Sequence, residues 1–399
     1  MKERVAQHVA ELPKSGIRKF FDIVAQSKDI VSLGVGEPDF DTPWHISRAA
    51  VTCLEDGGTH YTSNLGTPEL RQAIVRYLKR RFDATFDWQK EVLVTVGVSE
   101  AIDLAIRALC ASGDEVLYHE PCFVSYAPTI RLAHAVPVCV ETRVEDEFRL
   151  TVAALEKKVT PKTKAILLNF PCNPTGAVLG REDMLEILKF AAKHDLIILA
   201  DEVYSELNYG AGEDFRRETG DRPKVSCLTS FASFPEYHDN VILLNGFSKS
   251  WAMTGYRLGY ACGPNDIIDA MMKIHQYGIM SAPTLSQAAG VEAMDHGDKD
   301  VDRMRREYRK RRDYLVPALN GLGLRTVMPK GAFYIFSDIR STGLKDDEFA
   351  LKLLKEFGVA VVPGSAFGAC GAGFVRMSYA TSLEKIQLAV ERIGRMLAK

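Results

Sequence analysis

The chain has 399 residues, of which 46% are hydrophobic, enough to build a large domain with its own core and a smaller second domain. Its net charge of −2 gives no electrostatic basis for binding nucleic acid or an anionic membrane. No apolar run approaches the roughly 18 residues of a transmembrane helix. The first residues lack the apolar core of a signal peptide, so we expect a cytoplasmic protein.

The cysteines and histidines do not follow the spacings of common metal sites. The eight cysteines include no Cys-x-x-Cys pair, and the nine histidines include no His-Glu-x-x-His motif. In a chain of this length the pattern indicates reduced thiols rather than a disulfide framework. We therefore predict that the protein holds no metal.

The first 45 residues are expected to be mostly irregular. A short helix can begin at Ser15, and residues 31–43 contain the glycines and prolines of a loop. Glycine in such a loop lets the backbone come close to a ligand. A helix is expected over 43–56, followed by a loop that contains Tyr61.

From about residue 91 to residue 275, apolar runs alternate with helical segments. This alternation predicts a mostly parallel sheet with both faces covered by helices. In such sheets ligands bind beyond the carboxyl ends of the strands, so the residues that follow each strand are the candidates for a site. The expected strands lie at 92–96, 115–118, 136–140, 165–168, 196–200, 241–244 and 258–262. Residues 210–222 resemble an insertion and contain no interpretable motif.

The first of these strands is followed by Gly97, Val98 and Ser99, which open a helix that runs to about Cys110. Ser99 can be the N-cap of this helix. A helix N-terminus preceded by glycine also offers free backbone N–H groups to a phosphate, and the two interpretations are compatible.

Polar side chains also follow two later strands. Asn173 begins an Asn-Pro-Thr-Gly stretch, which is an ordinary turn sequence, although its amide can also donate to a ligand. Asp201 can be a cap or turn residue. A carboxylate at the end of a buried strand, however, needs a cationic partner. Tyr204, three residues later, can donate a hydrogen bond to the same ligand.

The stretch from Gly246 to Gly259 holds a lysine just past the end of an apolar strand. In so apolar a setting Lys249 loses hydration, so its pKa falls and its amine becomes nucleophilic. Arg257 follows, and an arginine can bind a phosphate through two hydrogen bonds. A nucleophilic amine beside a phosphate site is what a Schiff base with pyridoxal phosphate requires.

Beyond about residue 280 the pattern changes to that of a small α+β domain. A charged helix is expected over 298–322, and its run of arginines suggests nucleic-acid binding. Glu307 and Asp313 interrupt this run, and apolar residues recur at helical spacing, so we expect a solvated face of an amphipathic helix. Further strands and helices are expected near 331–336, 346–357, 359–362 and 373–380, the last of which contains Arg376.

The lysine stretch resembles the signature of class I aminotransferases, a family that uses pyridoxal phosphate. The order and spacing of Gly97-x-Ser99, Phe123, Asn173, Asp201 with Tyr204, Lys249 and Arg257 match the same family from Ser15 to about Glu391. The stretches at 36–43 and 172–178 look most similar to prokaryotic aspartate and aromatic aminotransferases.

This resemblance implies an α/β protein of the type I fold of pyridoxal-phosphate enzymes. A large domain would span 46–280 with a mostly parallel seven-stranded sheet, and a small α+β domain would combine 1–45 with 281–399. The family also implies a homodimer with sites at the subunit interface.

The resemblance further implies a role for each candidate residue. Lys249 would hold the cofactor and then carry a proton, and Asp201 would pair with the ring nitrogen, which keeps the ring an electron sink. Arg376 would bind the substrate α-carboxylate through two parallel hydrogen bonds. The other implied contacts are Gly97, Val98, Ser99, Ser248 and Arg257 at the cofactor, Asn173 and Tyr204 at its 3-oxygen, Phe123 on its ring face, Tyr61 at the phosphate of the other subunit, and Gly36, Phe123 and Asn173 on the substrate side.

The expected reaction is amino transfer between an L-amino acid, aromatic or aspartate-like, and a 2-oxo acid such as 2-oxoglutarate. A β-lyase, a decarboxylase or an amino-acid synthase of the same fold remains an alternative, as does a donor such as alanine or glutamate with prephenate. A nicotinamide oxidoreductase ranks low because no strand is followed by Gly-x-Gly-x-x-Gly. A regulator that binds the cofactor without turnover usually has an added DNA-binding domain, for which the N-terminal segment is too short.

The sequence does not identify the donor. Aspartate would need a second cation for its distal carboxylate, and the sequence points to none. An aromatic ring would need an apolar pocket, which Ile17, Phe20 and Tyr334 could supply.

Overall fold

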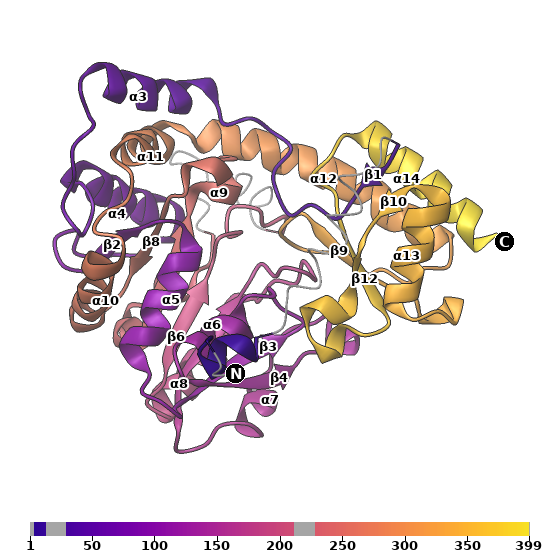
Figure 1. The fold of residues 1–399 in the computed structure, drawn as a ribbon, viewed down its shortest axis with the longest axis horizontal. Coiled ribbons are helices and arrows are strands. Elements are labelled where there is room, and N and C mark those ends of the chain that lie inside the picture. Colours follow the sequence, from indigo (N-terminus) through magenta and orange to yellow (C-terminus); the bar gives the residue numbers. More distant parts are fainter. Residues whose placement is uncertain (1–3, 13–28, 211–227, 399) are drawn as a thin grey trace, which may run out of the picture.

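The computed structural model describes residues 4–12, 29–210 and 228–398 (Figure 1). The helix expected at Ser15, the pocket residues Ile17 and Phe20, and residues 211–222 of the expected insertion lie outside these ranges.

A seven-stranded sheet forms the centre of the larger part of the molecule, with the strand order β2-β8-β7-β6-β5-β3-β4. Only β8 runs antiparallel to its neighbours, so the sheet is mostly parallel, as the alternating pattern predicts. The strands are β2 (Val92–Thr95), β3 (Glu115–Glu120), β4 (Val136–Glu141), β5 (Thr163–Asn169), β6 (Ile197–Asp201), β7 (Val241–Gly246) and β8 (Gly259–Cys262). The predicted α/β fold is confirmed.

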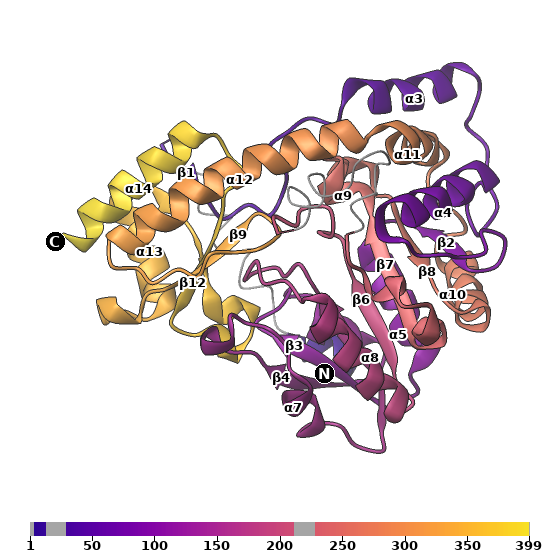
Figure 2. The same cartoon turned by 180° about the vertical axis from the view of Figure 1, so that it is seen from behind.

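Helices cover both faces of this sheet (Figures 1 and 2). Neighbouring residues of one strand point to opposite faces: on β5, Leu167 packs into the cluster with α5 and α6, whereas Ile166 and Leu168 pack into the cluster with α8. One face holds α5 (Val98–Leu109), α6 (Tyr126–Leu132) and α10 (Asn265–Gly278); the other holds α4 (Pro68–Phe82), α8 (Arg181–Lys193) and α11 (Thr284–His296). Burial on both sides explains why the central strands β6 and β7 are largely apolar.

Four shorter or peripheral helices complete this part of the chain. α3 (Trp44–Glu55) packs on α11, and α1 (Gln7–Ala10) contacts α6. α7 (Val152–Glu156) packs beside β4, and α9 (Phe247–Ser250) follows β7 directly.

A smaller part is built around a three-stranded antiparallel sheet of order β11-β12-β9 and a parallel pair of β1 with β10. The N-terminal segment joins it because the Val31 N–H donates to the Gly358 carbonyl at 2.9 Å. Its elements are β1 (Val31–Ser32), β9 (Tyr334–Asp338), β10 (Val359–Ala360), β11 (Val362–Pro363), β12 (Phe374–Ser378), α12 (Asp298–Gly321), α13 (Asp346–Phe357) and α14 (Leu383–Leu397). The division of the chain at residues 46 and 280 stays a prediction.

The segment after β6 connects the two parts. Tyr204, Leu207 and Tyr209 pack into the same hydrophobic cluster as Phe333 and Tyr334 of the smaller part. The carboxyl end of the main sheet therefore lies directly against the smaller sheet.

The long helix α12 differs in part from the prediction that its arginines lie on the solvated face of an amphipathic helix. Arg311 and Arg312 are buried. Arg311 donates to both oxygens of Asp39, at 2.8 and 2.9 Å, and Arg312 donates to the Pro329 carbonyl at 2.9 Å. These partners lie far away in the sequence or on another loop, so helical spacing alone could not reveal them.

None of the helices in the described ranges combines the length and the apolarity that crossing a membrane requires.

Candidate active site

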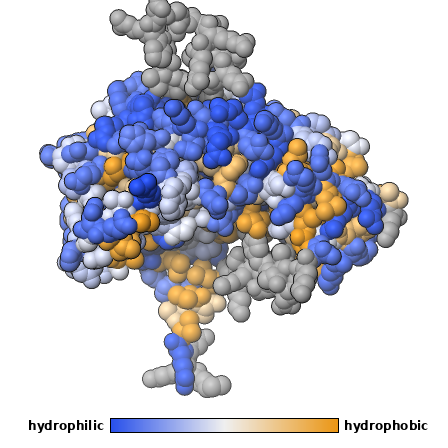
Figure 3. All heavy atoms as spheres, turned by 90° about the horizontal axis from the view of Figure 1, so that it is seen from above, coloured by the Kyte–Doolittle hydropathy of each residue, from blue (hydrophilic) through white to orange (hydrophobic). Residues whose placement is uncertain are grey.

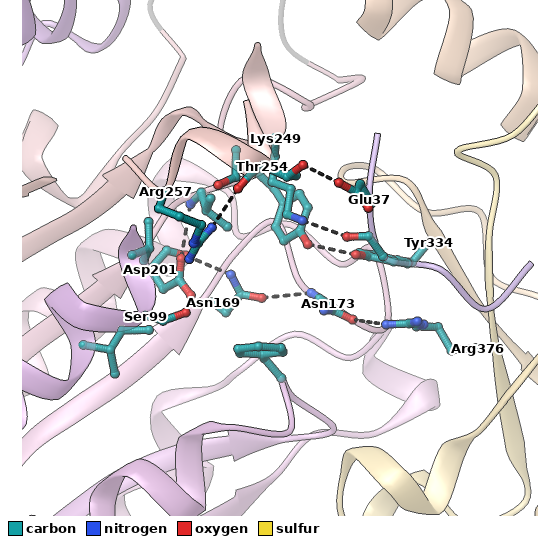
Figure 4. A pocket seen from close by; sticks show the side chains of 17 residues that line it. Glu37, Ser99, Asn169, Asn173, Asp201, Lys249, Thr254, Arg257, Tyr334 and Arg376 are labelled. Atoms are coloured by element: carbon teal, nitrogen blue, oxygen red, sulfur yellow. Dashed lines mark hydrogen bonds between the residues drawn. The ribbon is translucent and has the colours of Figure 1, made fainter. Parts of the chain in front are cut away.

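A cavity of about 400 Å³ lies where the carboxyl end of the main sheet meets the smaller sheet. Arg257 and Ser99 lie on one side, Arg376 and Tyr334 on the other, and Lys249, Asn169 and Asn173 between them (Figure 4). The cavity thus brings together predicted site residues from many elements: Gly36, Val98, Ser99, Phe123, Asn173, Asp201, Tyr204, Ser248, Lys249, Arg257 and Arg376. Its further lining residues are Glu37, Ile102, Asn169, Val203, Thr254 and Tyr334.

Lys249 lies on the short helix α9, immediately after the buried strand β7. Its Nζ donates to the Gly36 carbonyl at 2.7 Å. Burial lowers the pKa of Lys249 to about 8; the carboxylate of Glu37 opposes this change, and the nearby guanidinium groups of Arg376 and Arg257 reinforce it. At neutral pH a useful fraction of this amine is therefore unprotonated and nucleophilic.

Asp201 ends β6 and is buried at the base of the cavity. Its carboxylate accepts hydrogen bonds from the Tyr126 hydroxyl at 2.6 Å and from the Val203 N–H at 3.3 Å. Burial nevertheless raises the pKa of Asp201 to about 6. A cationic ring nitrogen in the cavity would favour the ionised carboxylate.

Tyr126 is a site residue that the sequence reasoning missed. A buried tyrosine hydroxyl needs a hydrogen-bond partner, and Tyr126, the first residue of α6, comes only three residues after Phe123. Phe123 itself is half-buried in the cavity wall, with its ring edge-on to Tyr126 at 5.8 Å between centroids.

Arg376 is buried on β12, and burial lowers its pKa. Its Nη1 donates to Asn173 Oδ1 at 3.1 Å, and its Nη2 donates to the Gly34 carbonyl at 2.5 Å. Its Nε is buried without a partner, and each Nη nitrogen has a second N–H. An unpaired buried donor beside the cavity fits a carboxylate that arrives with the substrate.

One side of the cavity, where the sequence predicts a phosphate site, is formed by the start of α5 and by Arg257. Gly97, with φ of +78°, is the N-cap of α5, so the expectation that Ser99 caps this helix is wrong. Val98 and Ser99 lie in the first turn, where backbone N–H groups have no intrahelical partner. A Cβ on Gly97 would come within 2.6 Å of Arg257 Nη2, so a larger residue there would displace the arginine from this position. Arg257 itself is bonded to the Thr254 carbonyl through Nη1 at 2.9 Å.

Asn173 and Tyr204 lie on the wall between these two sides. Because the amide oxygen of Asn173 accepts from Arg376, its amide NH₂ is left to donate to a bound ligand. The hydroxyl of Tyr204 pairs with that of Tyr334 at 2.9 Å. A Cβ on Gly36 would come within 2.7 Å of the Tyr334 hydroxyl oxygen, so glycine is needed there for the N-terminal loop to pass this wall.

Tyr61 lies outside the cavity, and 84% of it is exposed. Its expected contact with a phosphate needs a second subunit and stays a prediction.

These groups fit pyridoxal phosphate. The start of α5 and Arg257 suit a phosphate, Asp201 suits a protonated ring nitrogen, and Lys249 is an amine with a lowered pKa.

Comparison with known proteins finds relatives that match nearly the whole chain. Residues 28–393 match the family model for aminotransferase class I and II. The chain is 47% identical to the aspartate aminotransferase of Pyrococcus abyssi, over 96% of this chain and 95% of that protein. It is 44% identical to aromatic-amino-acid aminotransferase 2 of Thermococcus litoralis, again over 96% and 95%. The solved structure of the aromatic aminotransferase from Pyrococcus horikoshii superposes with a TM-score of 0.87 at 46% identity, covering 95% of this chain and 98% of that one. The chain therefore belongs to the class I and II aminotransferases, enzymes that depend on pyridoxal phosphate.

Proposed function

We propose that this aminotransferase takes its amino group from an L-amino acid with an aromatic side chain, in preference to aspartate, and passes it to a 2-oxo acid such as 2-oxoglutarate. The named relatives include both aspartate and aromatic aminotransferases, so similarity alone does not choose between the two donors.

The charges around the cavity support the aromatic donor. Among the described lining residues the cationic side chains are Lys249, Arg257 and Arg376. Each already has a partner in the proposed chemistry: the cofactor aldehyde, the phosphate and the α-carboxylate. None of them remains for the distal carboxylate of aspartate, and Glu37 at the cavity wall would repel it. Ile102, Phe123 and Tyr334 instead offer apolar and aromatic surface to a ring.

When bound, pyridoxal phosphate supplies a carbonyl for the substrate amine and a ring that takes up the electron pair of the substrate Cα–H bond. The residues of the chain supply orientation and proton transfer. Arg376 fixes the α-carboxylate, and Asp201, ionised beside a cationic ring nitrogen, keeps that nitrogen protonated. Lys249 Nζ, with a pKa near 8, can take the proton from the substrate Cα and deliver it to the cofactor.

A donor panel tests the proposal. With 2-oxoglutarate as acceptor, phenylalanine or tyrosine should give a kcat/KM at least about tenfold above that of aspartate, because an apolar pocket gains from the ring and leaves the distal carboxylate unpaired. A higher kcat/KM for aspartate would refute the choice of donor. Quantifying the new amino acid against released ammonia separates transfer from elimination.

We further propose that the enzyme is a homodimer whose partner subunit contributes Tyr61. Large exposed side chains support this: Trp44 is 72% exposed, Tyr61 84% and Tyr277 89%. The loop of Tyr61 lies against the end of α10, since Asn64 Nδ2 donates to the Met280 carbonyl at 2.8 Å. On the face seen in Figure 3, hydrophobic atoms form separate patches within a mostly hydrophilic surface. Contiguous apolar patches on a surface commonly mark contacts with a partner.

Mixed dimers provide the test. Y61A subunits keep Lys249, and K249A subunits keep Tyr61, so only a mixed dimer contains a site with both residues. Unfolding and refolding the two variants together should restore activity that neither has alone. No gain on mixing, or full activity in a verified monomer, would contradict the shared site.

A further inference from the structure

Two thiols and a carboxylate meet away from the cavity. The ligand atoms of Glu120, Cys139 and Cys370 all lie within 4.8 Å of one another. Glu120 ends β3, Cys139 lies on the neighbouring strand β4, and Cys370 lies in the short turn Ala369–Gly371 of the smaller part. All three residues are half-buried, so an ion could reach them from solvent.

The carboxylate of this cluster is held in place by its neighbours. The Tyr118 hydroxyl donates to Glu120 Oε1 at 2.7 Å, and the Ala369 N–H donates to Oε2 at 3.0 Å. Gly368, with φ of +116°, lets the turn come this close, because a Cβ there would lie 2.3 Å from the Glu120 carboxyl carbon. Backbone and side chain thus position the carboxylate beside the two sulfur atoms.

The donor set suits one class of ion. Two thiolates with one carboxylate favour a borderline-soft divalent cation such as Zn²⁺ over Mg²⁺ or Ca²⁺. In a tetrahedral zinc site with zinc–sulfur bonds of about 2.3 Å, the two sulfur atoms lie about 3.8 Å apart. The observed cluster needs at most a small contraction to reach that geometry.

We propose that Glu120, Cys139 and Cys370 bind Zn²⁺, with a water molecule as the fourth ligand. The ion would link strands β3 and β4 of the main sheet to the turn Ala369–Gly371 of the smaller part. That turn follows Phe367, whose carbonyl accepts from the Cys122 N–H at 3.1 Å and whose ring lies 4.8 Å from the Arg376 guanidinium. The zinc site therefore restrains the position of Arg376 relative to Phe123, the residue after Cys122, without touching either one.

The test uses the holoenzyme, reduced and then stripped of metal with a chelator. After addition of Zn²⁺ and gel filtration, elemental analysis should find one zinc per wild-type chain and none in the C139S/C370S double variant. C110S, which changes another half-buried thiol, should retain one zinc and is the matched control. The cofactor absorption spectrum should be the same in all of these proteins, which shows that each has folded.

Two milder variants keep both thiols. Competition with a chromophoric chelator should show that E120Q binds Zn²⁺ more than about tenfold more weakly, since it replaces an anionic ligand with a neutral amide oxygen. Y118F removes only the hydroxyl that orients the carboxylate, and its affinity should fall by about 10–100-fold. Zinc uptake that persists in the double variant, or no uptake by reduced wild-type protein, would overturn the proposal. So would a Cys139–Cys370 disulfide that resists reduction and replaces zinc binding.

Discussion

Replacing Asp201 with asparagine should make the cofactor-free protein more stable while removing most of the activity. Burial raises the pKa of Asp201 from 3.8 to about 6 in the folded chain. Above pH 6 the folded protein must therefore keep an ionised carboxylate in a place that disfavours it. Asparagine has nearly the same shape and no charge, so the variant avoids this cost.

The magnitude follows from the pKa difference. A shift of about 2 pKa units corresponds to about 3 kcal/mol of unfolding free energy at neutral pH. Asparagine can accept only one of the hydrogen bonds from Tyr126 and Val203, which offsets about 0.5–1.5 kcal/mol. The net gain of roughly 2 kcal/mol should raise the Tm by a few degrees. The folded pKa is the higher one, so the gain is complete above pH 6, shrinks as the pH falls below 6, and is lost near pH 4.

Thermal and denaturant unfolding of the two cofactor-free proteins at pH 7.5 and pH 4.5 measures this effect. Addition of pyridoxal phosphate should reverse the order of stability, because the cationic ring nitrogen pairs with the carboxylate of the wild type and not with the amide. D103N, which changes a half-buried aspartate paired with Arg107 outside the cavity, should leave the stability within about 0.5 kcal/mol. A cofactor-free D201N that is less stable than wild type at pH 7.5, or a difference that does not change with pH, would refute the reasoning.

Three further predictions concern the cationic residues of the cavity. K249A should lose covalent cofactor attachment, so peptide mapping after borohydride reduction should find a pyridoxyl label on Lys249 of the wild type and no labelled peptide in the variant. In the cofactor-free wild type the rate of attachment should rise as the pH passes about 8, where the amine loses its proton. A label on a different lysine would contradict this assignment. R257A should weaken retention of the cofactor by about tenfold or more, since a charge-assisted bond to phosphate is lost, and unchanged affinity in equilibrium dialysis would make Arg257 a purely structural residue. R376K keeps the charge and loses the planar pair of donors, so kcat/KM should fall by about 30-fold to several thousand-fold for every substrate with an α-carboxylate, at normal cofactor content. An equal loss for simple amines would show that Arg376 supports the fold instead.

The features that the sequence predicts well depend on neighbouring residues. The strand β7 and the helix α13 (Asp346–Phe357) lie where their apolar patterns place them, because burial on both faces or on one face leaves a local periodicity. The residues that follow the strands meet in one cavity, because the carboxyl ends of parallel strands share one edge of the sheet.

The features that the sequence does not predict depend on distant contacts. Arg311 is buried because Asp39 lies beside it in the folded chain, and Tyr126 reaches Asp201 across 75 positions. The cap of α5 is Gly97, with a positive φ, and the helix begins at Val98, so Ser99 already lies inside the first turn. The thiols of Cys139 and Cys370 come from strand β4 and from the turn Ala369–Gly371, so no spacing of cysteines in the sequence relates them, and the prediction of no metal did not consider this cluster.

The hydrogen bond from Arg376 to the Gly34 carbonyl joins residues 342 positions apart in the chain. During synthesis at about 5–20 residues per second, the N-terminal segment leaves the ribosome roughly 20–70 s before the strand it pairs with. The residues around Lys249 and Asp201 are made in the interval. The Gly34 carbonyl therefore stays without its final partner until Arg376 has been made, and the Arg376 side of the cavity is the last part of the site that translation can complete.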